Sequence, residues 1–201
     1  MIWALNRSAP EEISTVATPT VLPTARVAPT MVIPEIPFSD ITDSAGINFV
    51  HENGAEGEKL LPETMGGGGA FFDFDNDGDQ DLLCINSTVW PWAQRKAETI
   101  PTSQLYANDG TGKFTNVTVG SGLDVEMYGN GVACGDFDND GDVDVFISCV
   151  GANHLFRNVG AGKFVDISDT AGVSGQPNDW GTSCGWFITI WMAIWICSWP
   201  T

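Results

Sequence analysis

Two nine-residue segments of the chain consist mainly of carboxylates. Residues 73–81 read Asp-Phe-Asp-Asn-Asp-Gly-Asp-Gln-Asp, and residues 136–144 read Asp-Phe-Asp-Asn-Asp-Gly-Asp-Val-Asp. The five carboxylates in each segment repel one another, and neither segment contains a basic residue that would offset this repulsion. A hard divalent cation that takes roughly six to eight oxygen ligands, above all Ca²⁺, would relieve it. The pattern therefore predicts one calcium site in each segment.

Each position of these segments has an expected role in holding the ion. The carboxylates at positions 1, 3 and 5 are expected to point inward, and Gly78 or Gly141 at position 6 permits a sharp turn. Position 7 would offer its main-chain carbonyl, and the carboxylate at position 9 would close the site. The predicted ligands are Asp73, Asp75, Asp77, Asp79 and Asp81 in the first segment and Asp136, Asp138, Asp140, Asp142 and Asp144 in the second.

The residues around these segments favour strands over helices. An EF-hand would need a bidentate glutamate at its twelfth position, where this chain has Cys84 and Ile147. The runs 82–85 and 143–147 are short and rich in β-prone residues. A solvated acidic turn is the alternative, but the pattern occurs twice with glycine in the same place. Each segment is thus predicted to be a loop between two antiparallel strands.

A longer phrase of the sequence is also repeated. Residues 38–47 (Phe-Ser-Asp-Ile-Thr-Asp-Ser-Ala-Gly-Ile) resemble residues 114–123 and 164–173. In the last two copies the preceding residues match as well, with a spacing of 50 residues between Leu105 and Leu155. A fixed period near 50 with short strands and glycine-rich turns is typical of β-propeller blades. We expect an all-β fold of incomplete propeller blades.

Composition excludes several classes of function. The net charge of −18 would repel nucleic acid phosphates, so we expect no nucleic acid partner. The five cysteines show no CxxC spacing, which argues against zinc. They are expected to be buried free thiols, with a disulfide as the alternative if the protein is exported. Neither His51 nor His154 has sequence neighbours that suggest catalysis, and no nucleophile–base–orienter set is evident. We therefore expect a non-enzymatic protein.

The linking phrases carry a family resemblance. The phrase at 38–47 is followed by His51-Glu-Asn-Gly, by Leu61-Pro-Glu-Thr-Met-Gly-Gly-Gly and then by the first acidic loop. This order resembles the FG-GAP/VCBS repeat region of ASPIC/UnbV-type proteins, relatives of cartilage acidic protein, over about residues 38–187. It is also similar to the calcium-binding blades of integrin alpha chains. The resemblance implies an extracellular β-propeller that carries Ca²⁺ on blade hairpins and serves in binding or adhesion.

The two ends of the chain differ from the repeats. Residues 1–37 are rich in proline and threonine and are expected to form a disordered linker. A third acidic loop is due after Phe187, but residues 188–201 are apolar, and we interpret them as the product of a reading-frame shift. Restoring one G before codon 188 recreates Asp-Tyr-Asp-Leu-Asp-Gly-Asp-Leu-Asp, and the single codons of Trp and Met force three of its key positions. A membrane anchor or a buried strand is the alternative, although 14 apolar residues (186–199) are fewer than the ~20 of a spanning helix.

Three functions are open at this point. The first is a calcium-binding, extracellular or periplasmic module for binding or adhesion, with a protein or glycan ligand and no membrane span, cut from a larger propeller. The second is a non-catalytic propeller part of a secreted carbohydrate-active enzyme. A calcium buffer is the third, and it is disfavoured because no helices flank the loops.

Overall fold

The computed structural model describes residues 37–94, 99–188 and 194–196. The chain divides into two units, Met1–Ser39 and Asp40–Thr201, and the helices and strands of the described residues all belong to the second. The predicted linker at 1–37 lies outside the described residues except for its last residue, and so does most of the tail at 188–201. No helix in the described part of the chain is long and apolar enough to cross a membrane.

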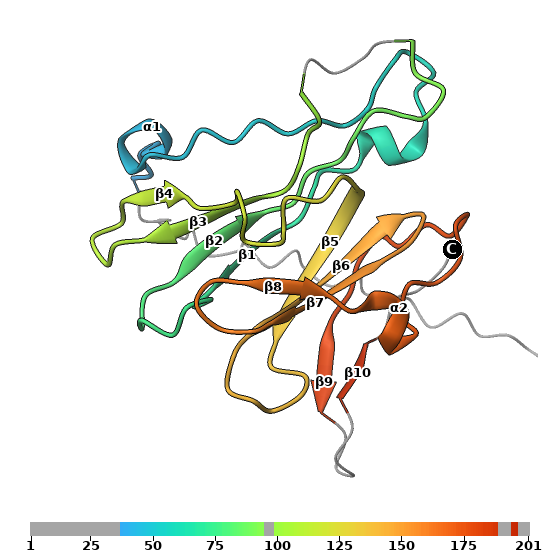
Figure 1. The fold of residues 1–201 in the computed structure, drawn as a ribbon. Coiled ribbons are helices and arrows are strands. Elements are labelled where there is room, and N and C mark those ends of the chain that lie inside the picture. Colours follow the sequence, from blue (N-terminus) through green and yellow to red (C-terminus); the bar gives the residue numbers. More distant parts are fainter. Residues whose placement is uncertain (1–36, 95–98, 189–193, 197–201) are drawn as a thin grey trace, which may run out of the picture. The chain divides into compact units, whose positions relative to one another are not determined.

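Two antiparallel sheets of four strands form the second unit, and each follows the order of the chain (Figure 1). The strands of the first sheet are β1 (Gly69–Phe72), β2 (Asp81–Cys84), β3 (Gln104–Asn108) and β4 (Phe114–Asn116). Those of the second sheet are β5 (Tyr128–Gly135), β6 (Asp144–Val150), β7 (His154–Asn158) and β8 (Phe164–Asp166). Four-stranded meanders with short loops are the blades of a propeller, and propellers take roughly four to eight of them. The prediction of an all-β fold of incomplete propeller blades is confirmed.

The acidic loops occupy equivalent places in the two blades. The first joins β1 to β2, where Phe72 pairs with Asp81. The second joins β5 to β6, where Gly135 pairs with Asp144. Each loop is therefore the turn of the first hairpin of its blade, as the β-prone flanks predict. A third hairpin, β9 (Trp186–Ile188) with β10 (Ile194–Ile196), follows the second blade.

One hydrophobic core serves both blades. Its members are mostly large residues of the inner strand faces, together with residues that link β4 to β5: Phe72, Phe74, Leu83, Ile85, Leu105, Leu123, Met127, Val145, Ile147, Cys149, Phe156 and Phe164. The two blades approach each other closely where Gly68, just before β1, meets β5. Its N–H donates to the Asn130 carbonyl at 2.6 Å, and a Cβ on it would lie 2.9 Å from that oxygen. The glycine run before β1 thus permits close main-chain contact.

The repeated phrase connects each repeat of the sequence to the next. Its first copy forms α1 (Thr42–Ala45) and its last forms α2 (Ser168–Ala171), and the glycine after each helix has a left-handed conformation. A Cβ on Gly46 would lie 2.6 Å from the carbonyl oxygen of Phe114, the first residue of the second copy. A Cβ on Gly122 would lie 2.1 Å from the carbonyl oxygen of Phe164, the first residue of the third copy. These glycines are required because the main chain of the next copy passes directly over them.

A lysine completes this attachment in both places. The Nζ of Lys163 donates to the Gly120 carbonyl at 2.6 Å, and that of Lys113 donates to the Ser44 carbonyl. The two lysines precede the phenylalanines that cover the glycines, and each binds the copy before its own. The 50-residue period therefore reflects a repeated contact between successive repeats of the sequence as well as a repeated strand pattern.

Candidate metal centres

The first aspartate of each acidic loop holds the loop closed. The two carboxylate oxygens of Asp73 accept hydrogen bonds from the N–H groups of Asp77 (3.1 Å) and Gly78 (2.9 Å). Asp136 accepts the equivalent bonds from Asp140 (3.2 Å) and Gly141 (3.0 Å). Because both oxygens of a short side chain accept hydrogen bonds from the main chain, the aspartate at position 1 gives the turn a defined shape.

Two left-handed residues produce the sharp curvature of each loop. Gly78 and Gly141, at position 6, have φ angles of 94° and 95°. Asn76 and Asn139, at position 4, have φ angles of 61° and 59°. Asparagine tolerates this conformation better than most residues with a side chain. The sequence pattern singled out the glycine but not the asparagine, whose repetition at position 4 was the available signal.

The aspartate at position 9 is buried beneath the loop. Asp81 and Asp144 each have 0% of their surface exposed. Asp81 accepts hydrogen bonds from the N–H groups of Phe74 (3.0 Å) and Asn108 (2.8 Å). Asp144 accepts the matching bonds from Phe137 (2.9 Å) and Asn158 (2.8 Å). Each carboxylate therefore ties the start of its loop to the third strand of its blade.

Positions 1, 3 and 9 converge in both loops. Carboxylate oxygens of Asp73, Asp75 and Asp81 lie within 4.8 Å of one another, and the trio of Asp136, Asp138 and Asp144 meets the same criterion. A set made only of carboxylate oxygens suits a hard cation such as Ca²⁺ and does not suit zinc, which prefers nitrogen and sulfur. The residues present thus fit the predicted ion.

Positions 5 and 7 lie outside these trios. The Asp77 side chain accepts a hydrogen bond from the Asp79 N–H at 2.9 Å, and Asp140 accepts the equivalent bond from Asp142. Their roles as an inward carboxylate and a carbonyl ligand stay predictions. The two loops also contact each other, since Asn76 donates to the Asp142 carboxylate at 2.7 Å.

Burial and neighbouring carboxylates make the ionised form of the trios energetically unfavourable. Burial, followed by the charges of Asp138 and Asp140, raises the pKa of Asp144 from 3.8 to about 6, although hydrogen bonds from Phe137 and Asn158 act in the opposite direction. Burial likewise raises the pKa of Asp81. A cation beside these carboxylates would favour their ionised form, so both sites are suited to exchange a proton for a metal ion.

Two asparagines outside the loops support the sites. Asn108 and Asn158, 50 residues apart, donate their N–H groups to the buried aspartates. The Asn158 side chain is also fully buried and donates to the carbonyls of Phe74 (2.8 Å) in the first loop and Val143 (3.3 Å) in the second. The sequence reveals their spacing, but their function depends on the pairing of β6 with β7 and on the contact between blades.

The histidines and cysteines were assigned no chemistry from the sequence. His154 nevertheless has a partner, because its Nδ1 lies 2.7 Å from the Asp166 carboxylate. The Ser168 hydroxyl also donates to Asp166 and not to His154, so these three residues make no contact between a nucleophile and a base. Four cysteines lie in the described residues, and all four are free thiols: Cys84, Cys134, Cys149 and Cys184.

Comparison with protein families agrees with this geometry. The model of the FG-GAP-like repeat matches residues 73–147 and again residues 136–187. Together these matches extend over more than half of the 201 residues and include both acidic loops. A search of curated proteins gave no match. With two matched repeats, two equivalent blades and an acidic loop on the first hairpin of each, the chain belongs to the FG-GAP-like repeat family.

Proposed function

We propose that the chain is a calcium-binding module of a larger β-propeller, which acts outside the cytoplasm in binding or adhesion and has no catalytic role. The observation that carries this proposal is the repetition of the carboxylate trio. The members of the two trios have matching burial, and Asp73 and Asp81 accept hydrogen bonds from the same main-chain positions as Asp136 and Asp144. A single acidic cluster is common on protein surfaces, but a matched pair at equivalent places indicates a shared ligand.

The ion would act on structure. Both trios lie at the turn of a blade's first hairpin, and their buried aspartates bond to β3 and β7. A cation there would neutralise the charge that opposes loop closure and would stabilise the folded state by mass action. Extracellular calcium is millimolar, which suits extracellular calcium modules of modest affinity. This is our reason for proposing a place outside the cytoplasm.

The finer relationship, to ASPIC/UnbV-type proteins, is part of the proposal. It is supported by the phrase Leu61-Pro-Glu-Thr-Met, which precedes the matched repeats and forms η1 (Leu61–Thr64). Glu63 of this phrase is buried and accepts hydrogen bonds from the Leu60 N–H (3.1 Å) and the Trp90 indole (2.9 Å). The phrase therefore has a defined structural role in this chain, in which it anchors the connection between β2 and β3.

Titration calorimetry with Ca²⁺ tests the metal sites. The wild-type chain is expected to bind two ions, and Asp138→Asn, which changes one exposed member of the second trio, is expected to bind one tightly. Asp124→Asn is the matched control, because Asp124 is exposed and belongs to neither trio. The absence of binding heat, together with a melting temperature that Ca²⁺ leaves unchanged, would refute the proposal.

A second experiment tests binding and adhesion. The chain is screened against immobilised matrix proteins and glycans, once with Ca²⁺ and once with EDTA. Retention that requires Ca²⁺ is the expected result. If nothing is retained in either condition while calorimetry still shows two ions, the adhesion part of the proposal fails and the metal sites stand.

A further inference from the structure

The first acidic loop is held in place partly by the second blade. Asn76 of the first loop donates to the Asp142 carboxylate of the second loop at 2.7 Å. The ring of Phe74 is buried against the turn between β7 and β8, where a Cβ on Gly162 would lie 2.9 Å from a ring carbon. The two candidate metal centres are therefore not structurally independent.

A continuous series of hydrogen bonds joins the buried aspartates of the two trios. Phe74 donates its N–H to Asp81 at 3.0 Å, and its carbonyl accepts a bond of 2.8 Å from the Asn158 side chain. The Asn158 N–H donates to Asp144 at 2.8 Å. Two residues, Phe74 and Asn158, thus connect a carboxylate of one trio to a carboxylate of the other. All four residues are buried.

This series passes through the main chain that carries two of the predicted ligands. Phe74 is the residue between Asp73 and Asp75, the other members of the first trio. Because the N–H and the carbonyl of Phe74 are both bonded, the main chain between these ligands has a fixed orientation. Groups in a buried hydrogen-bond network strengthen one another, so order at one end of the series favours order at the other.

We propose that Asn158 couples the two metal centres, so that Ca²⁺ at one of them raises the affinity of the other. A loaded second site would hold Asp144 in one orientation, and with it Asn158 and the Phe74 carbonyl. Part of the conformational entropy that the first loop loses on binding its own ion is then already lost. The coupling is reciprocal, because each ion must favour the other by the same factor.

Electrostatics acts in the opposite direction. A cation in one loop lowers the negative potential that attracts a cation to the other, and salt screens this effect. The sign of the coupling therefore distinguishes the two mechanisms. The inference rests on the proposed metal sites and adds how they bind together.

Calorimetry on the full chain with Ca²⁺ at about 0.15 M salt measures the coupling. Asp75→Asn and Asp138→Asn each silence one trio through an exposed member and give the binding constant of the other site alone. The coupling factor is the product of the two wild-type binding constants divided by the product of these two single-site constants. We expect a factor of about five or more in the wild type.

Asn158→Ala tests the residue, and Asn108→Ala is its matched control. Asn108 also donates its N–H to a buried aspartate, but its side chain bonds within its own blade, to Gln80 and to two glycines of the next turn. With the factor measured in the same three backgrounds, Asn158→Ala should bring it to about one, and Asn108→Ala should leave it within about twofold of the wild type. If Asn158→Ala lowers stability and leaves the factor unchanged, Asn158 has only a structural role and the inference is wrong.

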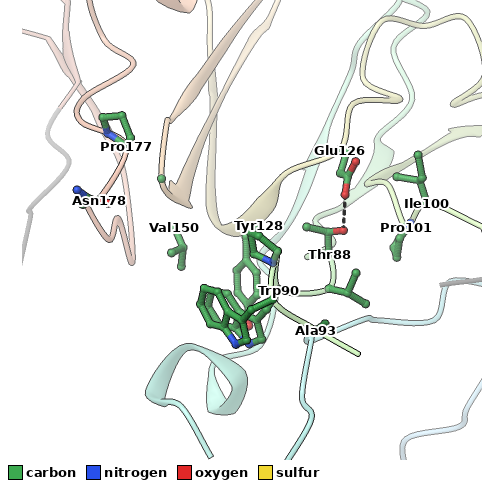
Figure 2. Close-up of a pocket in the computed structure, with 14 residues that line it drawn as sticks. Thr88, Trp90, Ala93, Ile100, Pro101, Glu126, Tyr128, Val150, Pro177 and Asn178 are labelled. Atoms are coloured by element: carbon green, nitrogen blue, oxygen red, sulfur yellow. Dashed lines mark hydrogen bonds between the residues drawn. The ribbon is translucent and has the colours of Figure 1, made fainter. Parts of the chain in front are cut away.

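A control for general contact between the blades lies at the other end of β5. This strand begins at Tyr128, whose hydroxyl donates to the Asn53 carbonyl at 2.6 Å. Figure 2 shows Tyr128 beside Trp90 in a cavity, and the lining residues drawn there belong to neither acidic loop. Tyr128→Phe should keep the coupling factor of the wild type. A loss as large as in Asn158→Ala would assign the coupling to blade packing in general and overturn the inference.

Two exposed asparagines provide a further test in case Asn158→Ala does not fold. Asn76→Gly removes the bond to Asp142, and glycine readily adopts the φ of 61° found at this position. Asn139→Gly is the matched control, because Asn139 has a φ of 59° and, within the described residues, no hydrogen bond to the first loop. The coupling factor should be about twofold lower in Asn76→Gly than in Asn139→Gly. Equal factors in the two would then contradict the inference.

Failure of the coupling can be told apart from failure of the metal sites. An absence of binding heat in the wild type refutes the sites and the coupling with them. Two bound ions with a coupling factor of one refute only the coupling. A factor below one also refutes it, and would show that repulsion between the ions outweighs the contact through Asn158.

Discussion

Two equivalent glycines allow the contribution of the contact between successive repeats to the free energy of unfolding to be measured. Gly122 and Gly172 are the penultimate residues of the second and third copies of the repeated phrase, lie 50 residues apart and have φ angles of 94° and 70°. A Cβ on Gly122 would lie 2.1 Å from the Phe164 carbonyl oxygen, whereas a Cβ on Gly172 would meet nothing within 4 Å. Gly122→Ala and Gly172→Ala therefore share a conformational cost, and only the first adds a collision.

The magnitudes follow from this difference. A left-handed conformation costs a residue with a Cβ about 1–2 kcal/mol, and both alanine variants carry that cost. Overpacking against well-fixed atoms adds about 1–3 kcal/mol, and the Phe164 carbonyl cannot move aside easily because the Phe164 N–H donates to the Ser121 carbonyl at 2.7 Å. We expect the free energy of unfolding to fall by about 1–2 kcal/mol in Gly172→Ala and by about 2–5 kcal/mol in Gly122→Ala.

Urea denaturation followed by tryptophan fluorescence, in saturating Ca²⁺, measures both values. Neither glycine belongs to a trio of carboxylates, so the calcium affinity of the folded state should be the same in both variants and in the wild type. If Gly122→Ala and Gly172→Ala lose the same stability, the repeated phrase does not connect one repeat to the next, and our explanation of the 50-residue period is wrong.

Four further predictions concern the metal sites and the asparagines that support them. At a free Ca²⁺ concentration of about 100 times the dissociation constant, each bound ion should add about 2.7 kcal/mol to the free energy of unfolding. The melting temperature should therefore be lower in EDTA than in Ca²⁺. Since the folded-state pKa of Asp144 is about 6, above its ordinary 3.8, the metal-free fold should lose stability as pH rises through this window. A proton would compete with the ion, so calorimetry should find calcium affinity at the second site about tenfold lower at pH 5 than at pH 7. Finally, Asn158→Ala removes the donor to two carbonyls and should cost about 3 kcal/mol in urea denaturation. The side-chain hydrogen bonds of Asn108 are all exposed, so Asn108→Ala is a control and should cost about 1 kcal/mol.

The sequence was sufficient for the features that depend on local pattern. The acidic loops, their placement between antiparallel strands and the blade architecture all follow from residue types at fixed spacing. The loops need glycine at position 6, and the blade contacts need Gly46 and Gly122, so these requirements are visible as repeated letters. A repeated structural constraint leaves a repeated sequence, which is why this part of the fold could be predicted.

Features that depend on contacts between distant residues could not be predicted in this way. No local pattern in the connection between β2 and β3 predicts that Trp90 is buried, because its burial depends on Tyr128 of the other blade, which stacks on it. The same holds for His154, whose partner Asp166 lies on the neighbouring strand. Asn158 shows its period in the sequence, but not that it joins two loops. Each of these residues acquires its role from the pairing of strands and blades.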